Sequence, residues 1–410
     1  MARPYIINAL DIGSGFLKLV TISKRPKEED FEILGFAKEP SIGIRKGVII
    51  DIQKVAEKIA FLVRKVEQDC GQKINNIYAN ITGGHIFCTC SRGLVSVSRA
   101  DQKISEEDVE RVLRAARAIS LSSNKEIIEV FPKEFIVDGE AGVREPVGME
   151  GVRLEVEALI LCGFSPYLKN SSQAILKAGL QINDLILNSL ASARAVLTSR
   201  EKELGVCVLD IGAGVTDMAV FEEGNLLHTA IFPIGSGHIT SDIAICLKTD
   251  IDAAEKIKLE FGTCETAYSK KDGKKIKIIR PGERSEEEQL LFSREELANI
   301  IGARVSEIFE LVNKELKKIS RQEMLPAGVV LTGGGARLPK IKNLARKELK
   351  LPCRVGASKI SANFQEDPSL STLYGLILEG FDVEEGRGNF SNFGKGIKEQ
   401  LKRFFRTLIP

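Results

Sequence analysis

The sequence predicts an α/β fold in which two similar domains face each other across a ligand cleft. The motif Asp-x-Gly-x-Gly occurs at Asp11 and again at Asp210, and both copies stand between two apolar, strand-like runs. A third glycine cluster, running from Thr332 to Ala336, also follows a short apolar run. Because a repeated motif is the sequence signature of repeated structure, the two hairpins indicate two related domains.

The composition is typical of a soluble globular protein with several domains. A chain of 410 residues exceeds one ordinary core, so two to four domains are expected. Apolar residues make up 43% of the chain, charged residues 28%, and the formal net charge is +2. Since nucleic-acid binders usually carry a clear basic excess, this balance predicts no nucleic-acid partner.

Cysteine usage and hydropathy bound the cellular setting. The eight cysteines are scattered and there are three histidines, so we expect reduced thiols in a reducing cytosol and no structural metal site. The first ten residues lack the pattern of a signal peptide. No window reaches about 18 uninterrupted apolar residues. Any membrane contact is therefore expected to lie on the bilayer surface.

The first 84 residues predict a β-hairpin followed by a helix and a strand. Strands are expected over 5–10 and 16–23, with the glycine-rich turn between them. Apolar residues at helical spacing predict a helix over 51–70, and a further strand is expected over 74–84.

Residues 85–162 differ in character and predict an inserted α+β subdomain. A strand is expected over 93–98. A helix is expected to begin at Ser105, where Asp108 three residues later forms the pattern of a helix-capping start.

The second half of the chain repeats the opening pattern. Helices are predicted over 165–179 and 188–203, and the second hairpin follows them. The third glycine cluster lies between a strand predicted over 328–331 and a helix predicted over 338–349. Residues 381–392 are polar and contain glycine, which predicts a flexible linker.

Each Asp-x-Gly-x-Gly hairpin is suited to binding phosphate. Glycine lets the backbone bring its N–H groups close to a ligand, and successive N–H groups form an anion-binding nest. The aspartates, Asp11 and Asp210, can hold Mg²⁺ through water. The phosphate-binding residues predicted with them are Gly13, Ser14, Gly15, Phe16, Lys18, Gly212, Ala213, Gly214, Thr216, Gly235 and Gly237.

One such turn alone is more often a plain β-turn, but the ordered set of three is specific. It resembles the superfamily of actin, Hsp70 and sugar kinases. That resemblance implies an actin-like ATPase fold, in which two RNase-H-like domains close over ATP and Mg²⁺.

A shorter motif, Ala-Glu-Lys-Ile-Lys, resembles a helix that bacterial actins place beside the nucleoside. Glu255 and Lys258 are three residues apart and so share one helical face. The alternative is an exposed charged helix. The resemblance implies nucleoside contacts from Glu255 and Lys258, and the third cluster is expected to add Gly333, Gly334, Gly335 and Ala336.

Nearly the whole chain resembles the FtsA family of bacterial cell division proteins. The resemblance is carried by DGEAGVREPVGMEGVRLEV in the inserted block, by IGSGHITSDIAICLKTDIDAAEKIK and by NSLASARAVL. It implies domain 1A over 1–84 and 163–195, subdomain 1C over 85–162, and domain 2 over 196–380 with subdomain 2B near 237–310. After the first hairpin the lysine stands only at Lys18, a departure from the family's usual spacing.

The FtsA resemblance also implies a function and partners. A member of the family polymerises with ATP and tethers FtsZ filaments of the division ring to the cytoplasmic face of the inner membrane. The FtsZ C-terminal peptide is expected on subdomain 2B, and later division proteins on subdomain 1C. The sequence alone identifies no general base, so ATPase activity is left open.

The last 18 residues, 393–410, predict an amphipathic helix that lies on a membrane containing anionic lipid. One face is apolar and its edge is basic, which is typical of an interfacial anchor; FtsA carries a similar tail. The alternative is a helix packed on the protein itself or on a partner. The predicted membrane-binding residues are Phe393, Ile397, Lys398, Leu401, Lys402, Arg403, Phe404, Phe405, Arg406 and Leu408.

Three other functions share parts of this pattern. A PilM-like pilus assembly protein is the nearest alternative, and it would lack the tail. A sugar kinase needs a substrate pocket with a catalytic aspartate. An Hsp70-like chaperone needs a β-rich domain after the ATPase, for which too few residues remain after residue 380.

Overall fold

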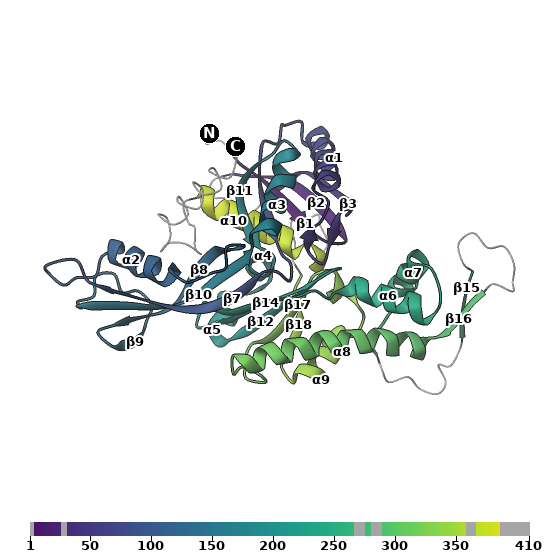
Figure 1. Ribbon diagram of the computed structural model, residues 1–410. Helices are drawn as coiled ribbons and strands as arrows, with labels where there is room; N and C mark the ends of the chain where they lie inside the picture. Colours follow the sequence, from purple (N-terminus) through teal and green to yellow (C-terminus); the bar gives the residue numbers. More distant parts are fainter. Residues whose placement is uncertain (1–3, 26–30, 266–274, 280–288, 358–365, 386–410) are drawn as a thin grey trace.

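The computed structural model describes residues 4–25, 31–265, 275–279, 289–357 and 366–385, and its core is built on two five-stranded sheets (Figure 1). The first sheet has the order β11-β6-β1-β2-β3 and the second has the order β14-β13-β12-β17-β18. In chain order, the first three strands of each sheet pair antiparallel, and the last two strands are added in parallel beside the first of them. The shared topology confirms two similar domains and the actin-like fold class.

The first sheet is covered on both faces. Helices α1 and α3 pack against one face, where Leu10, Leu17 and Leu19 are buried, and α10 packs against the other. Asp51 caps α1 by accepting from the Lys54 amide, and Gly71 ends that helix with a left-handed φ of 66°. The elements of this domain are β1 (Tyr5–Ile12), β2 (Phe16–Lys24), β3 (Glu32–Pro40), β4 (Ile44–Arg45), β5 (Val48–Ile49), α1 (Ile52–Cys70), β6 (Asn76–Ile81), α3 (Ser165–Lys177), β11 (Gln181–Leu187) and α10 (Ser371–Glu384).

The second sheet packs against the long helix α8 and against α9 (Figure 1). Helix α6 packs on α8, and α7 packs on α6, beyond the sheet. The elements here are α4 (Asn188–Val196), α5 (Ser199–Leu204), β12 (Val206–Ile211), β13 (Thr216–Glu222), β14 (Asn225–Phe232), α6 (Ser236–Cys246), α7 (Ile251–Phe261), β15 (Lys275–Ile279), β16 (Gln289–Ser293), α8 (Arg294–Lys318), β17 (Gly328–Thr332), η3 (Gly334–Arg337), α9 (Ile341–Leu349), β18 (Cys353–Val355) and η4 (Pro368–Leu370).

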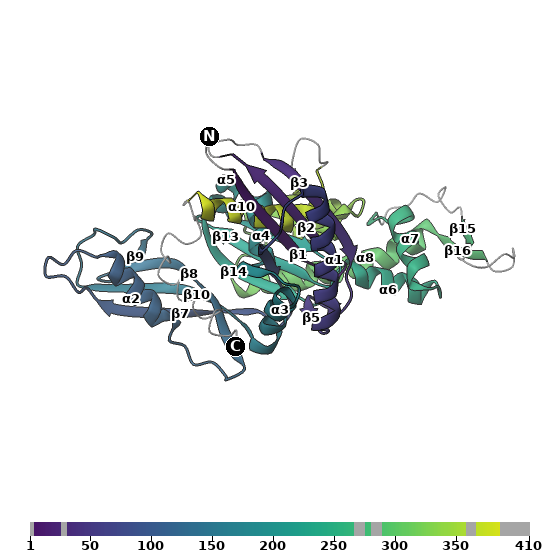
Figure 2. The ribbon, with the colours of Figure 1, turned by 90° about the horizontal axis from the view of Figure 1, so that it is seen from above.

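The inserted block forms its own four-stranded sheet, in the order β7-β10-β8-β9, with one helix packed on it. Seen from two directions, it extends from one side of the molecule while β15 and β16 lie at the opposite side (Figures 1 and 2). The predicted capping start is present as a reciprocal pair between Ser105 and Asp108. The elements are β7 (Phe87–Ser96), α2 (Glu106–Arg117), β8 (Lys125–Val137), β9 (Glu140–Val143) and β10 (Arg153–Phe164).

Several predicted boundaries are wrong. The helix predicted over 188–203 is two helices, because Thr198 and Glu201 form a capping box that starts a new helix at Ser199. The helix after the third glycine cluster begins at Ile341, after a 3₁₀ turn. Helix α10 continues to Glu384, so the first residues of the predicted linker over 381–392 are helical.

The rest of that linker and the predicted anchor over 393–410 lie outside the described residues. Among the helices that the structure does describe, none combines the length and the apolar character needed to cross a bilayer.

Candidate functional site

The first hairpin turn is a tight backbone loop between β1 and β2. The Gly13 amide donates to the Phe16 carbonyl over 3.2 Å, and the Ser41 amide donates to the Gly15 carbonyl over 3.0 Å. A Cβ atom on Gly13 would lie 2.8 Å from the Phe16 carbonyl oxygen, so only glycine fits there. The side chain of Phe16, directly after the turn, is 42% exposed.

The second hairpin turn repeats this geometry between β12 and β13. The Gly212 amide donates to the Val215 carbonyl over 2.9 Å. At this hairpin, the carbonyls of Gly212 and Ala213 accept from the amides of Ser236 and Gly237, each over 2.8 Å. The start of α6 is thereby fixed against the turn, as the prediction of Gly235 and Gly237 for the phosphate side requires.

Thr216 is the exception among the predicted phosphate residues of this hairpin. Its hydroxyl is buried and donates to the Ile234 carbonyl over 2.9 Å. The side chain therefore fixes the approach to α6.

The two turns, one from each domain, are in direct contact. A Cβ atom built on Gly15 would lie 2.9 Å from Ala213 Cβ, and one built on Gly214 would lie 2.6 Å from Ser14 Oγ. Ser14 Oγ also accepts from the Gly47 amide over 2.9 Å. The backbones of both domains thus meet at the two turns.

The third glycine cluster lies against the aspartate of the second hairpin. Gly333 has a φ of 80°, and a Cβ atom there would lie 2.2 Å from Asp210 Oδ1. A Cβ atom on Gly335 would lie 2.4 Å from Ile211 Cγ2. Glycine is required at both positions because the loop packs directly on the end of β12.

A buried amide links the acidic groups of the two domains. Asn188, the first residue of α4, donates through Nδ2 to Asp210 Oδ2 over 3.2 Å and to Asp217 Oδ2 over 3.1 Å. Its Oδ1 accepts from Asn80 Nδ2 over 2.9 Å and from Thr372 Oγ1 over 3.0 Å. Asn188 therefore uses both donors and both acceptor sites within one network.

The first aspartate is paired within its own domain. Asp11 accepts from Lys18 Nζ at Oδ2 over 2.5 Å and from Asn80 Nδ2 at Oδ1 over 3.2 Å. Lys18 Nζ also donates to the Ser369 carbonyl over 2.9 Å. Lys18, predicted as a phosphate contact, is thus already bound to Asp11, one of the two carboxylates predicted to hold Mg²⁺.

Burial changes the acidity of the second domain's carboxyl groups. Desolvation raises the pKa of Asp210 to about 6, and the charge of Asp11 adds to the rise. Desolvation, with the charge of Asp210, also holds the pKa of Asp217 well above its ordinary value. Thr82 Oγ1 donates to Asp217 Oδ1 over 2.5 Å. Negative charge is costly here unless a cation arrives.

Glu255 and Lys258 lie together on α7, facing α6. Lys258 Nζ is 2.7 Å from Glu255 Oε2 and donates to Thr240 Oγ1 over 2.8 Å and to the Ser236 carbonyl over 3.3 Å. Thr240 also donates to Glu255. The alternative, an exposed charged helix, does not fit Lys258, because the side chain of Lys258 is buried.

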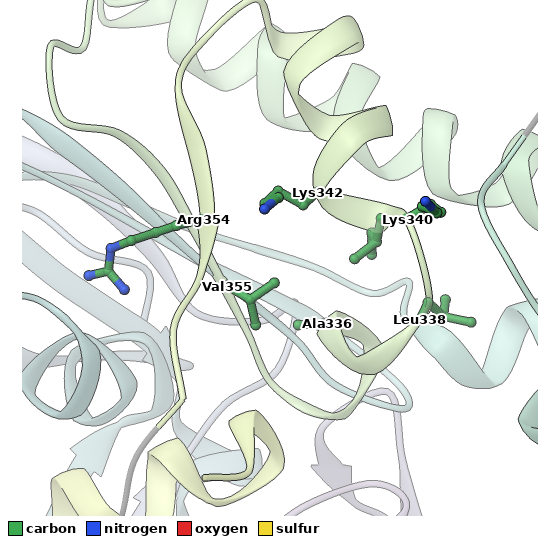
Figure 3. A pocket seen from close by; sticks show the side chains of 7 residues that line it. Ala336, Leu338, Lys340, Lys342, Arg354 and Val355 are labelled. Carbon is green, nitrogen blue, oxygen red and sulfur yellow. The ribbon is translucent and has the colours of Figure 1, made fainter.

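A cavity of about 330 Å³ borders the third glycine cluster (Figure 3). Of the third glycine cluster, Ala336 lines the cavity, and neither Glu255 nor Lys258 does. Its lining residues are Ala336, Leu338, Lys340, Ile341, Lys342, Arg354 and Val355.

The donor groups present fit a Mg²⁺–nucleotide ligand. Two carboxylates and the backbone amides of two hairpin turns converge, and Mg²⁺ is usually held by one or two carboxylates together with substrate phosphates. Asp210 Oδ1 lies beside Gly333, where the loop approaches it without a side chain. A cation here would offset the desolvation that raises the pKa of Asp210.

Sequence reasoning missed the members of the network that are not in glycine motifs. These residues are Asn80, Thr82, Asn188, Asp217 and Thr372, all buried. A signal was available, since polar residues within otherwise apolar strands, or at the first turn of a helix, are uncommon in a core.

Comparison with known families matches two parts of the chain. A family model described as "Cell division protein FtsA" matches residues 207–375, and one described as "SHS2 domain inserted in FTSA" matches residues 83–162. Similar proteins include the cell division protein FtsA of Neisseria meningitidis, with 36% identity over 98% of this chain and 98% of that protein. The FtsA of Pseudomonas aeruginosa has 33% identity over 97% of both chains.

Solved structures with this fold are more distant in sequence. The PilM-PilN type IV pilus biogenesis complex superimposes with a TM-score of 0.65 at 17% identity, covering 91% of this chain and 98% of that one. MreB5 of Spiroplasma citri bound to ADP gives a TM-score of 0.56 at 14% identity, covering 95% and 99%. These likenesses show the fold.

Proposed function

Because the chain belongs to the FtsA family of cell division proteins, we propose that it binds MgATP between its two domains and, in that state, assembles into filaments that tether the division ring to the membrane. The observation that carries the proposal is the approach of two glycine hairpins from different domains over a shared acidic network. ATP that contacts both domains binds the closed form better than the open one, and so shifts the population towards it.

Within this proposal the hairpins hold the phosphates and the third cluster holds the nucleoside. The amides of Ser14 to Phe16 and of Ala213 and Gly214 would face the phosphate chain, and α6 would border that side. Glu255 and Lys258 border the nucleoside from α7, opposite the Gly333 to Ala336 loop.

Asp11 and Asp210 would hold Mg²⁺ through its water ligands, and the bound ion would neutralise charge on the phosphates. Asn188 orients both second-domain carboxylates, Asp210 and Asp217, through its two donors. Lys18 Nζ is 2.5 Å from Asp11 Oδ2, so the ion would share that carboxylate with the lysine.

Membrane attachment is assigned to the amphipathic segment 393–410, whose apolar residues would enter the interface while its lysines and arginines meet anionic headgroups. One short helix binds reversibly. Neighbouring subunits in a filament present many helices to one surface, and avidity then strengthens attachment by about 10²–10⁴-fold. The protein would act at the division site, on the cytoplasmic face of the inner membrane.

The proposed partners follow the division of the chain. The C-terminal peptide of FtsZ would bind subdomain 2B, near 237–310. Later division proteins would bind the inserted subdomain over 85–162, and a second copy of this chain would form the filament contact.

A PilM-like role is the second candidate, favoured by the superposition on the PilM-PilN complex at 17% identity. It is weaker, because the sequence relatives at 33–36% identity are cell division proteins. A sugar-kinase role has no supporting observation in the site.

The test is sedimentation with liposomes that contain anionic lipid, with and without MgATP. We expect the full chain to co-sediment more strongly with MgATP, and a chain ending at Gly386 to stay in solution while still binding ATP. Full chain carrying Phe404→Glu and Phe405→Glu should behave like the shortened one.

Equal sedimentation of the full and shortened chains would show that the tail is not an anchor. If both chains fail to bind MgATP, the nucleotide part of the proposal is wrong.

A further inference from the structure

Three cations gather beside the first hairpin turn, of which one is already committed. The side chain of Lys18 is buried. It forms an ion pair with Asp11 and donates to the Ser369 carbonyl as a second acceptor. It therefore cannot give a phosphate its full charge without leaving that carboxylate.

A second lysine, Lys38, lies directly beside Lys18 on the neighbouring strand of the sheet. In the strand pairing, Asp11 is opposite Lys18 and Lys18 is opposite Lys38 on β3. Directly opposed residues share one face of a sheet, so the three side chains lie on one face. It is the face of Val20 and Ile22, which α10 covers further along β2.

Lys38 is held at that place by an aromatic ring. Its Nζ lies 3.9 Å from the centroid of the Phe16 ring, and Phe16 is the residue directly after the turn. A cation over an aromatic face is attracted without being neutralised. Within the described residues, no carboxylate forms an ion pair with Lys38.

The third cation comes from the second domain. Arg337 ends the 3₁₀ turn of the third glycine cluster, and its guanidinium lies 3.8 Å from Asp367 with the side chain 63% exposed. Burial and the charge of Lys18 lower the pKa of Lys38; Arg337 lowers it further and Asp367 opposes it. The charge of Arg337, which belongs to the second domain, therefore opposes the charge of Lys38.

We propose that Lys38 and Arg337 bind the polyphosphate of the nucleotide from opposite domains, so that the anion joins two cations that otherwise repel. The proposal rests on the proposed nucleotide function and assigns two further ligand-binding residues to it. Lys18 is paired with Asp11, and Arg337 lies 3.8 Å from Asp367. Lys38 forms no ion pair with a carboxylate of the described residues, so its charge is available to a phosphate chain. Lysine and arginine both donate charge-assisted hydrogen bonds to phosphate oxygens.

The test is calorimetric titration of the full chain with MgATP, MgADP and adenosine. We expect Lys38→Gln to weaken MgATP and MgADP about tenfold, the size expected for losing one charge-assisted contact. Adenosine binding should change less than twofold. Lys38→Arg should retain affinity within about threefold, since it keeps the charge. Lys347→Gln, an exposed charge on α9, is the matched control.

A second readout separates ligand binding from a structural role. In ligand-free protein, Lys38→Gln and Arg337→Gln each relieve repulsion, so thermal unfolding should occur at the same temperature or higher. A fall in that temperature together with weaker adenosine binding would identify structural residues and overturn the proposal.

Failure of the two proposals is distinguishable. If wild-type protein does not bind MgATP, the proposed function fails. If wild type binds MgATP and Lys38→Gln binds it equally well, only the assignment of Lys38 fails.

Discussion

Asp210 lies in a buried position, where ionising its carboxyl group costs the folded chain free energy. The side chain is 4% exposed, Asn188 donates to one of its oxygens, and Gly333 packs against the other. Desolvation raises its pKa to about 6. Ionising this carboxyl group is costly in the free protein, and a bound cation offsets that cost. The buried charge therefore lowers the stability of the free protein and raises its affinity for the ligand.

We predict that Asp210→Asn stabilises the ligand-free protein at neutral pH. A folded-state pKa above the unfolded value means that the stability contributed by the carboxyl group is full below about pH 4 and is lost as the pH rises through about 6. The variant should therefore gain up to about 3 kcal/mol over wild type at pH 7.5, and the gain should vanish near pH 4. Urea unfolding at several pH values measures this.

The same variant should lose MgATP binding, because the neutral amide cannot balance the ion. Asp252→Asn, at an exposed position in the first turn of α7, should change neither quantity. A variant that is less stable than wild type at pH 7.5 would contradict the prediction.

At this scale the sequence predicts the residues that carry backbone constraints better than those that carry side-chain networks. Gly13 and Gly333 are recognisable because their motif repeats or clusters, and a Cβ atom fits neither. Asn188 begins the NSLASARAVL motif and Asp217 follows the second hairpin, but their role in the network follows only from the folding that brings β13 and α4 together.

Among the elements, α4 and α10 make an unusually close helix contact. A Cβ atom on Gly375 of α10 would lie 1.8 Å from the Ala191 carbonyl oxygen of α4. Helix α4 leads from the first sheet into the second, and α10 returns from the second domain to the first. The glycine lets the two connections between domains pack backbone to backbone.

We therefore expect Gly375→Ala to destabilise the protein by about 3 kcal/mol, because two backbones must separate to admit the methyl group. Gly380→Ala, on the same helix, meets first the Ile7 Cγ2 atom at 2.7 Å. A side chain can move, so that variant should cost about 1 kcal/mol or less. Equilibrium urea unfolding gives both values, and equal effects would show that the α4–α10 contact is not the constraint.

The elements that the sequence predicts well have strong local signals. The hairpins, α1 and the capped start of α2 are in place, since alternation, helical spacing and caps are local properties. The break after Val196 and the extent of α10 were mispredicted. In the first case a capping box competes with a continuous helical pattern; in the second, a polar sequence is held helical by contact with the first sheet.

At the scale of the whole molecule, the inserted subdomain contacts the second domain through a chain of three side chains. Cys88 Sγ of β7 lies 3.4 Å from His228 Nδ1 of β14, and His228 Nε2 lies 3.2 Å from Glu315 of α8. Cys88 also donates to the Thr229 carbonyl over 3.2 Å. The contact joins an insertion in the first domain to two elements of the second.

This arrangement predicts unequal thiol reactivity on one strand. Burial raises the pKa of Cys88, whereas Cys90, two residues further along β7, is exposed. Alkylation of the native full chain, followed by mass spectrometry, should modify Cys90 several-fold faster than Cys88. His228→Ala should reduce the difference between the alkylation rates of Cys90 and Cys88. Equal rates in wild type would mean that β7 is not docked on β14.

The pairing of the domains follows from the repeated hairpin in the sequence, but this docking does not. Cys88 and His228 are 140 residues apart and share no motif, so only the completed fold relates them.

The return of α10 to the first sheet has a consequence for synthesis of the chain. Ile7, Ala9, Val20 and Ile22 are covered by α10. Strand β2 ends at Lys24 and α10 begins at Ser371. At about 5–20 residues per second, translation continues for roughly 20–70 s while that apolar face has no cover. The nascent chain is thus a substrate for holdase chaperones, and the domain that begins first on the ribosome is completed last.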